Sequence, residues 1–84
     1  MQEIEIGAIT HYFNHLNVGI IQLKDVLKVG DTIHIKGHSE DFSQSVDSMQ
    51  IEHINVQEAK SGDSVGLKVT QKVHPHDKVY KVII

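Results

Sequence analysis

Residues 27–33 (LKVGDTI) and residues 59–67 (AKSGDSVGL) decide the fold, because each contains a Gly-Asp turn that leads into alternating apolar residues. Glycine permits the tight backbone of such a turn, and apolar residues at every second position form one face of a strand. Residues 46–53 (VDSMQIEH) lie between the two turns and are also apolar at intervals. The stretch predicts a domain built from short strands and tight connections.

The length of the chain, 84 residues, predicts one domain over residues 1–84, near the lower limit for burying a core. Ordering one residue costs roughly 1.5 kcal/mol, so burial and entropy nearly cancel at this size. Closing a sheet into a barrel removes exposed strand edges and is an economical solution. Cysteine is absent, which excludes a disulfide framework and fits the reducing cytoplasm, where we expect the protein.

The charge of the chain argues against general nucleic-acid binding. Its formal net charge is −3, with eight lysines and no arginine, the residue that makes bidentate phosphate contacts. Seven histidines would reverse the sign in mild acid. The apolar runs are far shorter than the roughly 20 residues of a membrane helix, and the acidic start does not resemble a signal peptide. We therefore expect no membrane contact, and any RNA contact has to be local.

The pattern along the chain predicts an all-β fold, a small closed Greek-key barrel of about six or seven strands. The expected strands are residues 4–13 (bent at Gly7), 18–23, 32–36, 42–56 (with one or two bulges), 65–69 and 79–84. At most one helical turn is expected, at residues 56–60. Alternation places ten residues in the core, with Phe13 and Phe42 as further plugs: Ile6, Ile20, Ile33, Ile35, Met49, Ile51, Val65, Leu67, Val69 and Val82.

Several segments carry a resemblance to a known family, namely residues 7–13, 17–19, 27–31, 46–49 and 59–67. They resemble the hairpin, strands and Gly-Asp turns of domain 2, the β-barrel that follows the GTPase domain in translation elongation and initiation factors. In elongation factors this barrel helps to seat the aminoacylated end of tRNA. Residues 50–53 (QIEH) depart from the family, which places a basic side chain there. Similar barrels also serve as accessory domains of larger enzymes, including the tail of a collagenase-like peptidase family.

The sequence contains no Gly-x-x-x-x-Gly-Lys-Ser/Thr phosphate loop, so we expect neither nucleotide binding nor GTPase activity. The resemblance implies a stand-alone, non-catalytic binding module for RNA or translation-linked machinery, with tRNA, rRNA or translation proteins as partners and no cofactor. The alternative is a protein–protein adaptor or regulatory barrel without nucleic-acid binding. The negative charge and the absence of arginine favour that alternative.

The candidate binding residues are polar side chains near turns or on solvated strand faces: Lys36, His38, His53, Lys72, His74 and His76. No catalytic residues are expected, because Ser, His and Asp occur without a nucleophile-elbow turn. His74 and His76, beside Asp77, could form a weak surface metal site, but solvated turn histidines are the reading we prefer. Glu40 and Asp41 are expected to be a solvated turn.

Overall fold

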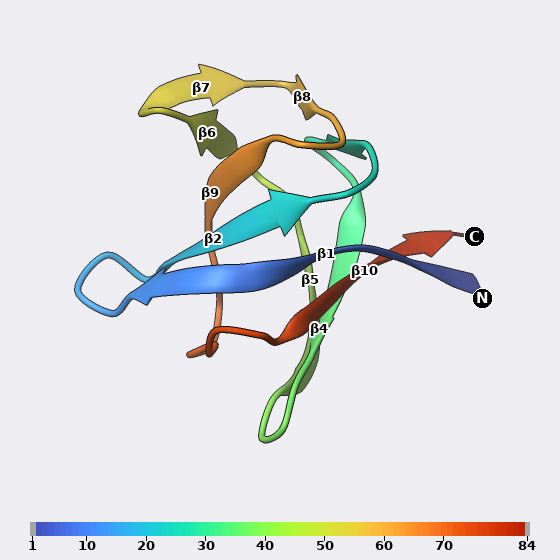
Figure 1. Ribbon diagram of the computed structural model, residues 1–84, viewed down its shortest axis with the longest axis vertical. Helices are drawn as coiled ribbons and strands as arrows, with labels where there is room; N and C mark the ends of the chain where they lie inside the picture. The colour runs from blue at the N-terminus through green and yellow to red at the C-terminus, as the bar shows by residue number, and fades with distance from the viewer. Residues whose placement is uncertain (1, 84) are drawn as a thin grey trace.

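The protein is built from β-strands. The computed structural model describes residues 2–83, which form ten strands and no helix (Figure 1). The strands are β1 Gln2–Phe13, β2 Val18–Leu23, β3 Leu27–Lys28, β4 Thr32–Lys36, β5 Asp41–Ser45, β6 Met49–Ile51, β7 Ile54–Val56, β8 Glu58–Ala59, β9 Ser64–Lys68 and β10 Lys78–Ile83. The all-β prediction is confirmed and the helical turn expected at residues 56–60 is wrong. Met1 and Ile84, which the predicted domain and last strand include, lie outside the described residues.

Eight strands form one antiparallel sheet in the order β5-β4-β10-β1-β2-β9-β6-β7, and β3 pairs with β8 separately. The end strands β5 and β7 are not paired with each other, so the closed barrel that we expected is not formed. The side chain of Gln44 in β5 bridges to the end of β9 instead. Its Nε2 donates to the carbonyl of Lys68 and its Oε1 accepts from the N–H of Thr70, each at 2.8 Å. Side-chain hydrogen bonds thus join regions that a closed barrel would join by a backbone ladder.

The single long strand expected over residues 42–56 is three strands. Val46 ends the first, because its N–H donates to Asp31 and its carbonyl accepts from Gly30, at 2.9 and 2.8 Å. Glu52 and His53 form the hairpin turn between β6 and β7, with φ of 51° and 67°. Two consecutive positive φ values are typical of a two-residue hairpin turn. The phase changes in the sequence therefore mark strand ends and not bulges.

Residues 28–31, 60–63 and 74–77 form three turns with one hydrogen-bond pattern, which we call the Asp turns. In each, Oδ2 of the fourth residue, an Asp, accepts from the backbone N–H of the first residue, at 2.9, 3.0 and 2.9 Å. The N–H of the same Asp donates to the carbonyl of the first residue, at 3.1, 3.0 and 3.2 Å. The two Gly-Asp turns predicted from sequence are confirmed, and the third turn was not predicted in this form.

The third residue of every Asp turn has a left-handed backbone. Its φ is 98° at Gly30, 96° at Gly62 and 78° at His76. Glycine adopts this conformation without steric cost, whereas a residue with a Cβ atom is strained there by roughly 1–2 kcal/mol. The turn at residues 74–77 therefore carries strain that the other two turns do not.

The core lies inside the curve of the sheet, and most of the predicted core is confirmed. Ile20 and Val82 are only half-buried and Phe13 is 48% exposed, so these three predictions are wrong, whereas Ile51 is half-buried but packs against the core. Ile20 faces away from the core because its neighbour Ile21 lies between the buried residues Ile9 of β1 and Val65 of β9. Nine buried apolar residues were not in the alternation-based list, although Phe42 was expected as a plug: Ile9, Ile21, Leu23, Leu27, Phe42, Val46, Ala59, Val73 and Val79.

The Asp turns yield a stability prediction at residue 63. Asp63→Ala removes the acceptor of the Lys60 N–H and should lower the free energy of unfolding by about 1 kcal/mol. For a domain of this size that corresponds to a fall in Tm of roughly 4–8 °C. Asp63→Asn keeps a side-chain oxygen at the same position and serves as the control. Equal losses in the two variants, measured by thermal unfolding, would contradict the role given to this hydrogen bond.

Candidate functional site

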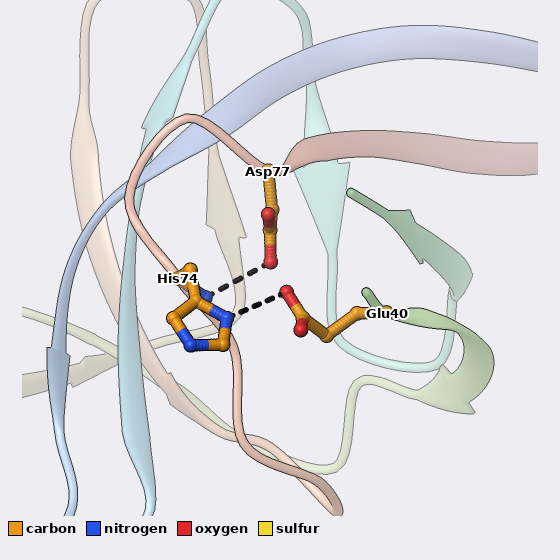
Figure 2. Close-up of side chains that lie close together, drawn as sticks. All are labelled: Glu40, His74 and Asp77. Carbon is orange, nitrogen blue, oxygen red and sulfur yellow. Dashed lines mark hydrogen bonds and ion pairs between the residues drawn. The ribbon is translucent and has the colours of Figure 1, made fainter. Parts of the chain in front are cut away.

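A cluster of two carboxylates and a histidine lies where two connections of the chain meet. Glu40 ends the loop between β4 and β5, while His74 and Asp77 belong to the Asp turn before β10 (Figure 2). Glu40 is 8% exposed and Asp77 is 4% exposed, and they are the buried polar residues of the described chain. We call these three residues the carboxylate–histidine cluster.

The backbone of both connections is fixed by hydrogen bonds. Gly37 donates its N–H to the carbonyl of Glu40 at 2.8 Å and closes the β4–β5 loop. Gly37 also has to be glycine, because a Cβ atom there would overlap the carboxyl group of Asp77. The turn is anchored on β1, where Ile9 accepts from His76 and donates to Asp77, each at 2.8 Å. The two connections are consequently packed directly against each other.

The carboxylate of Glu40 has one oxygen satisfied and one not. Ser39 donates its hydroxyl to Oε2 at 2.5 Å. Oε1 lies 2.9 Å from Nδ1 of His74 as an ion pair, but the angles of that approach are not those of a hydrogen bond. Among the described residues, Oε1 of Glu40 is a buried oxygen without a hydrogen-bond partner.

The electrostatics of the cluster distinguish its two carboxyl groups. Hydrogen bonding by the protonated Asp77 carboxyl group, followed by hydrogen bonding by the Ser39 hydroxyl and by His74, lowers the pKa of Glu40 to about 2. Burial, followed by the proximity of Glu40, raises the pKa of Asp77. Glu40 therefore ionises first, and the first negative charge of the pair lies on Glu40.

The contacts in the cluster are not those of a catalytic triad. A serine nucleophile has to bond a ring nitrogen of the histidine, whose other nitrogen bonds the aspartate. Here the hydroxyl of Ser39 bonds Glu40, and Asp77 bonds the backbone N–H of His74. The cluster offers instead two carboxylates and one imidazole, whose donor atoms all lie within 4.8 Å of one another. These are ligand types for a metal ion.

The structure brings three of the predicted binding residues together. His38, His74 and His76 line one hollow of about 370 Å³, which also contains Glu40 and Asp77. We call it the polar hollow. Glu40 was predicted to lie in a solvated turn, and this prediction is wrong because Glu40 is buried. A signal for Asp77 was present in the sequence, because it occupies the same fourth position as the Asp of the two Gly-Asp turns.

The other predicted binding residues are dispersed. Lys36 is exposed at the end of β4, opposite Lys78, and Lys72 is exposed between β9 and β10. His53, in the β6–β7 turn, lines a different hollow of about 500 Å³. That hollow is mostly apolar, and we call it the apolar hollow; its apolar lining is Phe13, Leu16, Val18, Ile20 and Gly66.

A second set of ionisable side chains, centred on His34 in β4, connects three strands of the sheet. Its Nδ1 lies 2.8 Å from Oε2 of Glu3 in β1, and its Nε2 contacts Oδ1 of Asp41 in β5. The side chain of His34 is only 17% exposed. Hydrogen bonding to Asp41, with a smaller contribution from Glu3, outweighs desolvation and raises the pKa of His34 above its ordinary value of 6.5.

Comparison with known proteins relates this chain to peptidases. It is 40% identical over 80 residues, or 94% of its length, to an uncharacterized protease of Methanocaldococcus jannaschii. It is 32% identical over 82 residues to a collagenase of Porphyromonas gingivalis. The chain spans about a fifth of the length of these relatives, 20% of each. No family model matches the chain.

Among solved structures, the chain is similar to the C-terminal domain of a Geobacillus thermoleovorans protein described as a U32 peptidase. The TM-score is 0.88 at 20% identity, over 94% of this chain and 92% of that domain. The selenomethionine variant of the same domain gives a TM-score of 0.86 at 19% identity, over 90% and 96% of the two chains. The fold is therefore that of this C-terminal domain.

These comparisons overturn the resemblance to translation-factor domain 2. The predicted module for RNA or translation-linked machinery, and its tRNA, rRNA and translation-protein partners, are wrong. The physical reason is that Gly-Asp turns and alternating strands specify tight connections and a buried face in any small β domain. Within residues 2–83, no helix is long and apolar enough to span a bilayer.

The strained turn yields a second stability prediction. His76→Gly should raise the free energy of unfolding by about 1 kcal/mol, because glycine adopts the left-handed φ of 78° without strain. His15→Gly, in an exposed turn where the backbone is not left-handed, is the control and should lose stability. Thermal unfolding of both variants is the measurement. A fall in Tm on His76→Gly would show that the side chain contributes more than the strain costs.

His34 predicts a pH dependence of stability. Its pKa is raised in the folded state, so its contribution is fully present below the unfolded value of about 6.5. The contribution is lost as the pH rises through the folded pKa. Urea unfolding at a series of pH values should show this fall, and His34→Gln should remove it. His15→Gln is the control, and a slope that persists unchanged in His34→Gln would contradict the assignment.

Proposed function

We propose that this chain is an accessory, non-catalytic domain of a U32-type peptidase and that it docks on the remainder of the peptidase through the apolar hollow. One observation carries the proposal: the chain matches almost the whole of a solved C-terminal domain but only a small part of a full-length protease. The chain covers 92% of a C-terminal domain and 20% of a protease. A unit that corresponds to one terminal domain is expected to assist a catalytic unit located elsewhere.

The contacts around Ser39 support a role other than catalysis. Its hydroxyl is held by the carboxylate of Glu40, and the His74 ring does not reach it. The carboxylate of Asp77 is engaged by the backbone of its own turn and does not orient an imidazole. In these contacts Ser39 is therefore not activated as a nucleophile.

Two of the four large exposed apolar residues of the described chain support docking at the apolar hollow. Phe13 is 48% exposed and Leu16 is 61% exposed, and both line the apolar hollow. The ring of Phe13 is stacked on His11, with centroids 6.4 Å apart and an interplanar angle of 7°, so it is held in its exposed position. Large apolar side chains gathered around a hollow are typical of an interaction surface. We infer that a segment of the catalytic part covers them.

The test replaces the matching fifth of the Methanocaldococcus jannaschii relative with this chain. Deletion of that fifth should lower gelatin hydrolysis or Tm, and the chimera should restore the lost property. The double variant Phe13→Ser, Leu16→Ser should not restore it, because docking would weaken by at least about tenfold. The isolated chain should hydrolyse no gelatin.

The control substitution is Gln71→Ser, an exposed position outside the apolar hollow, which should restore as well as the parent chain. The isolated double variant should keep a Tm within a few degrees of the parent, because surface changes cost about 0.5 kcal/mol or less. Full restoration by the double variant would exclude the apolar hollow as the docking face. Hydrolysis by the isolated chain would exclude the accessory role.

A further inference from the structure

We propose that Glu40, His74 and Asp77 bind a divalent transition-metal ion and that Zn²⁺ suits their donor set best. The three residues come from two segments far apart in sequence, and each offers a ligand atom within 4.8 Å of the other two. Figure 2 shows the three side chains converging between the β4–β5 loop and the Asp turn. The inference concerns this domain alone and does not depend on the peptidase assignment.

The orphaned oxygen of Glu40 is the first argument. The side chain is 7% exposed, and its Oε1 has no hydrogen-bond partner among residues 2–83. A buried carboxylate oxygen without a donor costs free energy, and native structures rarely retain one without a reason. The oxygen points toward Nδ1 of His74, 2.9 Å away. A cation between these atoms would satisfy the oxygen and relieve the proximity of two carboxylates.

The distances need only a small adjustment. Ligand bonds of about 2.1 Å to a tetrahedral zinc ion place neighbouring donor atoms roughly 3.4 Å apart. Oε1 of Glu40 and Nδ1 of His74 are already slightly closer than that, and the remaining donor separations are at most 4.8 Å. Closing these remaining separations would complete a set of three protein ligands. The polar hollow gives solvent access to a fourth position.

Neighbouring hydrogen-bond donors orient the proposed ligands, as outer-shell residues do around bound metal ions. Ser39 fixes Oε2 of Glu40 at 2.5 Å, and the His74 N–H fixes Oδ2 of Asp77 at 2.9 Å. Ser39 thereby leaves Oε1 of Glu40 free for the ion. Oδ2 of Asp77 faces the cluster and its Oδ1 packs against Gly37, so the orientation of both carboxylates is set by their neighbours, as it is by outer-shell partners in metal sites. An imidazole with two carboxylates favours Zn²⁺ over Ca²⁺, which takes six to eight oxygens, and over Mg²⁺, which prefers oxygen ligands and water.

The strain at His76 is an independent argument. The same turn occurs twice elsewhere with glycine at the left-handed position, so a relaxed solution is available to this chain. Strained backbone conformations cluster at functional sites. His76 and His38 also line the polar hollow and place further imidazole nitrogens at its edge.

The experiment titrates the tag-free 84-residue chain with Zn²⁺, followed by thermal unfolding and by NMR of the histidine rings. Zn²⁺ should raise Tm and shift the His74 ring signals, and millimolar Mg²⁺ should not compete. Glu40→Gln should weaken binding by at least about tenfold, since even outer-shell changes cost 10–100-fold. His15→Gln, an exposed histidine away from the cluster, is the matched control and should bind as the parent does.

Folding of the variants is part of the same test. Without metal, Glu40→Gln should be less stable than the parent, because the lowered pKa of Glu40 means that its carboxylate form is favoured in the fold, so the Tm of each metal-free variant is the reference for its own Zn²⁺ titration. His74→Gln is the second variant: the His74 side chain is half exposed, and its backbone N–H makes the turn. Three results would overturn the proposal: no change with millimolar Zn²⁺, parental affinity in both variants, or an equal loss in His15→Gln.

Discussion

The hydrogen bond from a backbone N–H to the Asp three residues later is the interaction on which the rest of the structure depends. It occurs at residues 28–31, 60–63 and 74–77, and each turn leads directly into a strand of the main sheet, β4, β9 and β10. An 84-residue domain has little core with which to offset chain entropy. Turns that fix their own backbone reduce the entropy that the core has to overcome. Each turn thereby fixes the residue at which the following strand begins.

The third Asp turn differs from the other two in burial and in strain. Asp77 is 4% exposed and packs against Gly37, whereas the carboxylates of the first two turns are only partly buried. Its left-handed residue is a histidine, and its neighbour Glu40 has an oxygen without a donor. Each of these features lowers stability, and the chain already contains the relaxed form of the same turn. Local departures of this kind are expected where a site serves something other than folding. This contrast singles out the polar hollow from the rest of the surface.

The sequence predicted what depends on local pattern. The Gly-Asp turns, the strand over residues 18–23 and the strand over residues 32–36 were correct because glycine and alternation act over a few residues. The burial of Ile21 in place of Ile20 was missed because both are apolar, and only the pairing of β2 with β1 and β9 decides which of them faces the core. Glu40 was taken for a solvated turn residue because its burial depends on a segment more than thirty residues away. A turn at residues 74–77 was expected, but its likeness to the two Gly-Asp turns was missed because His76 occupies the position of the glycine.

The two hollows share no lining residue and differ in chemistry, and this separation bears on how the domain can work. The apolar hollow is built on the β1–β2 turn and the β6–β7 hairpin, while the polar hollow joins the β4–β5 loop to the turn before β10. A surface that docks by apolar burial loses its solvent, whereas a cluster that binds an ion needs an open position. Because no residue serves both, the domain can be held against a larger protein without closing the cluster. An ion there would link two connections that converge on β10, the strand between β4 and β1 in the main sheet. Ion binding in the polar hollow would then make the domain itself more rigid, whereas the apolar hollow would attach the domain to the larger protein.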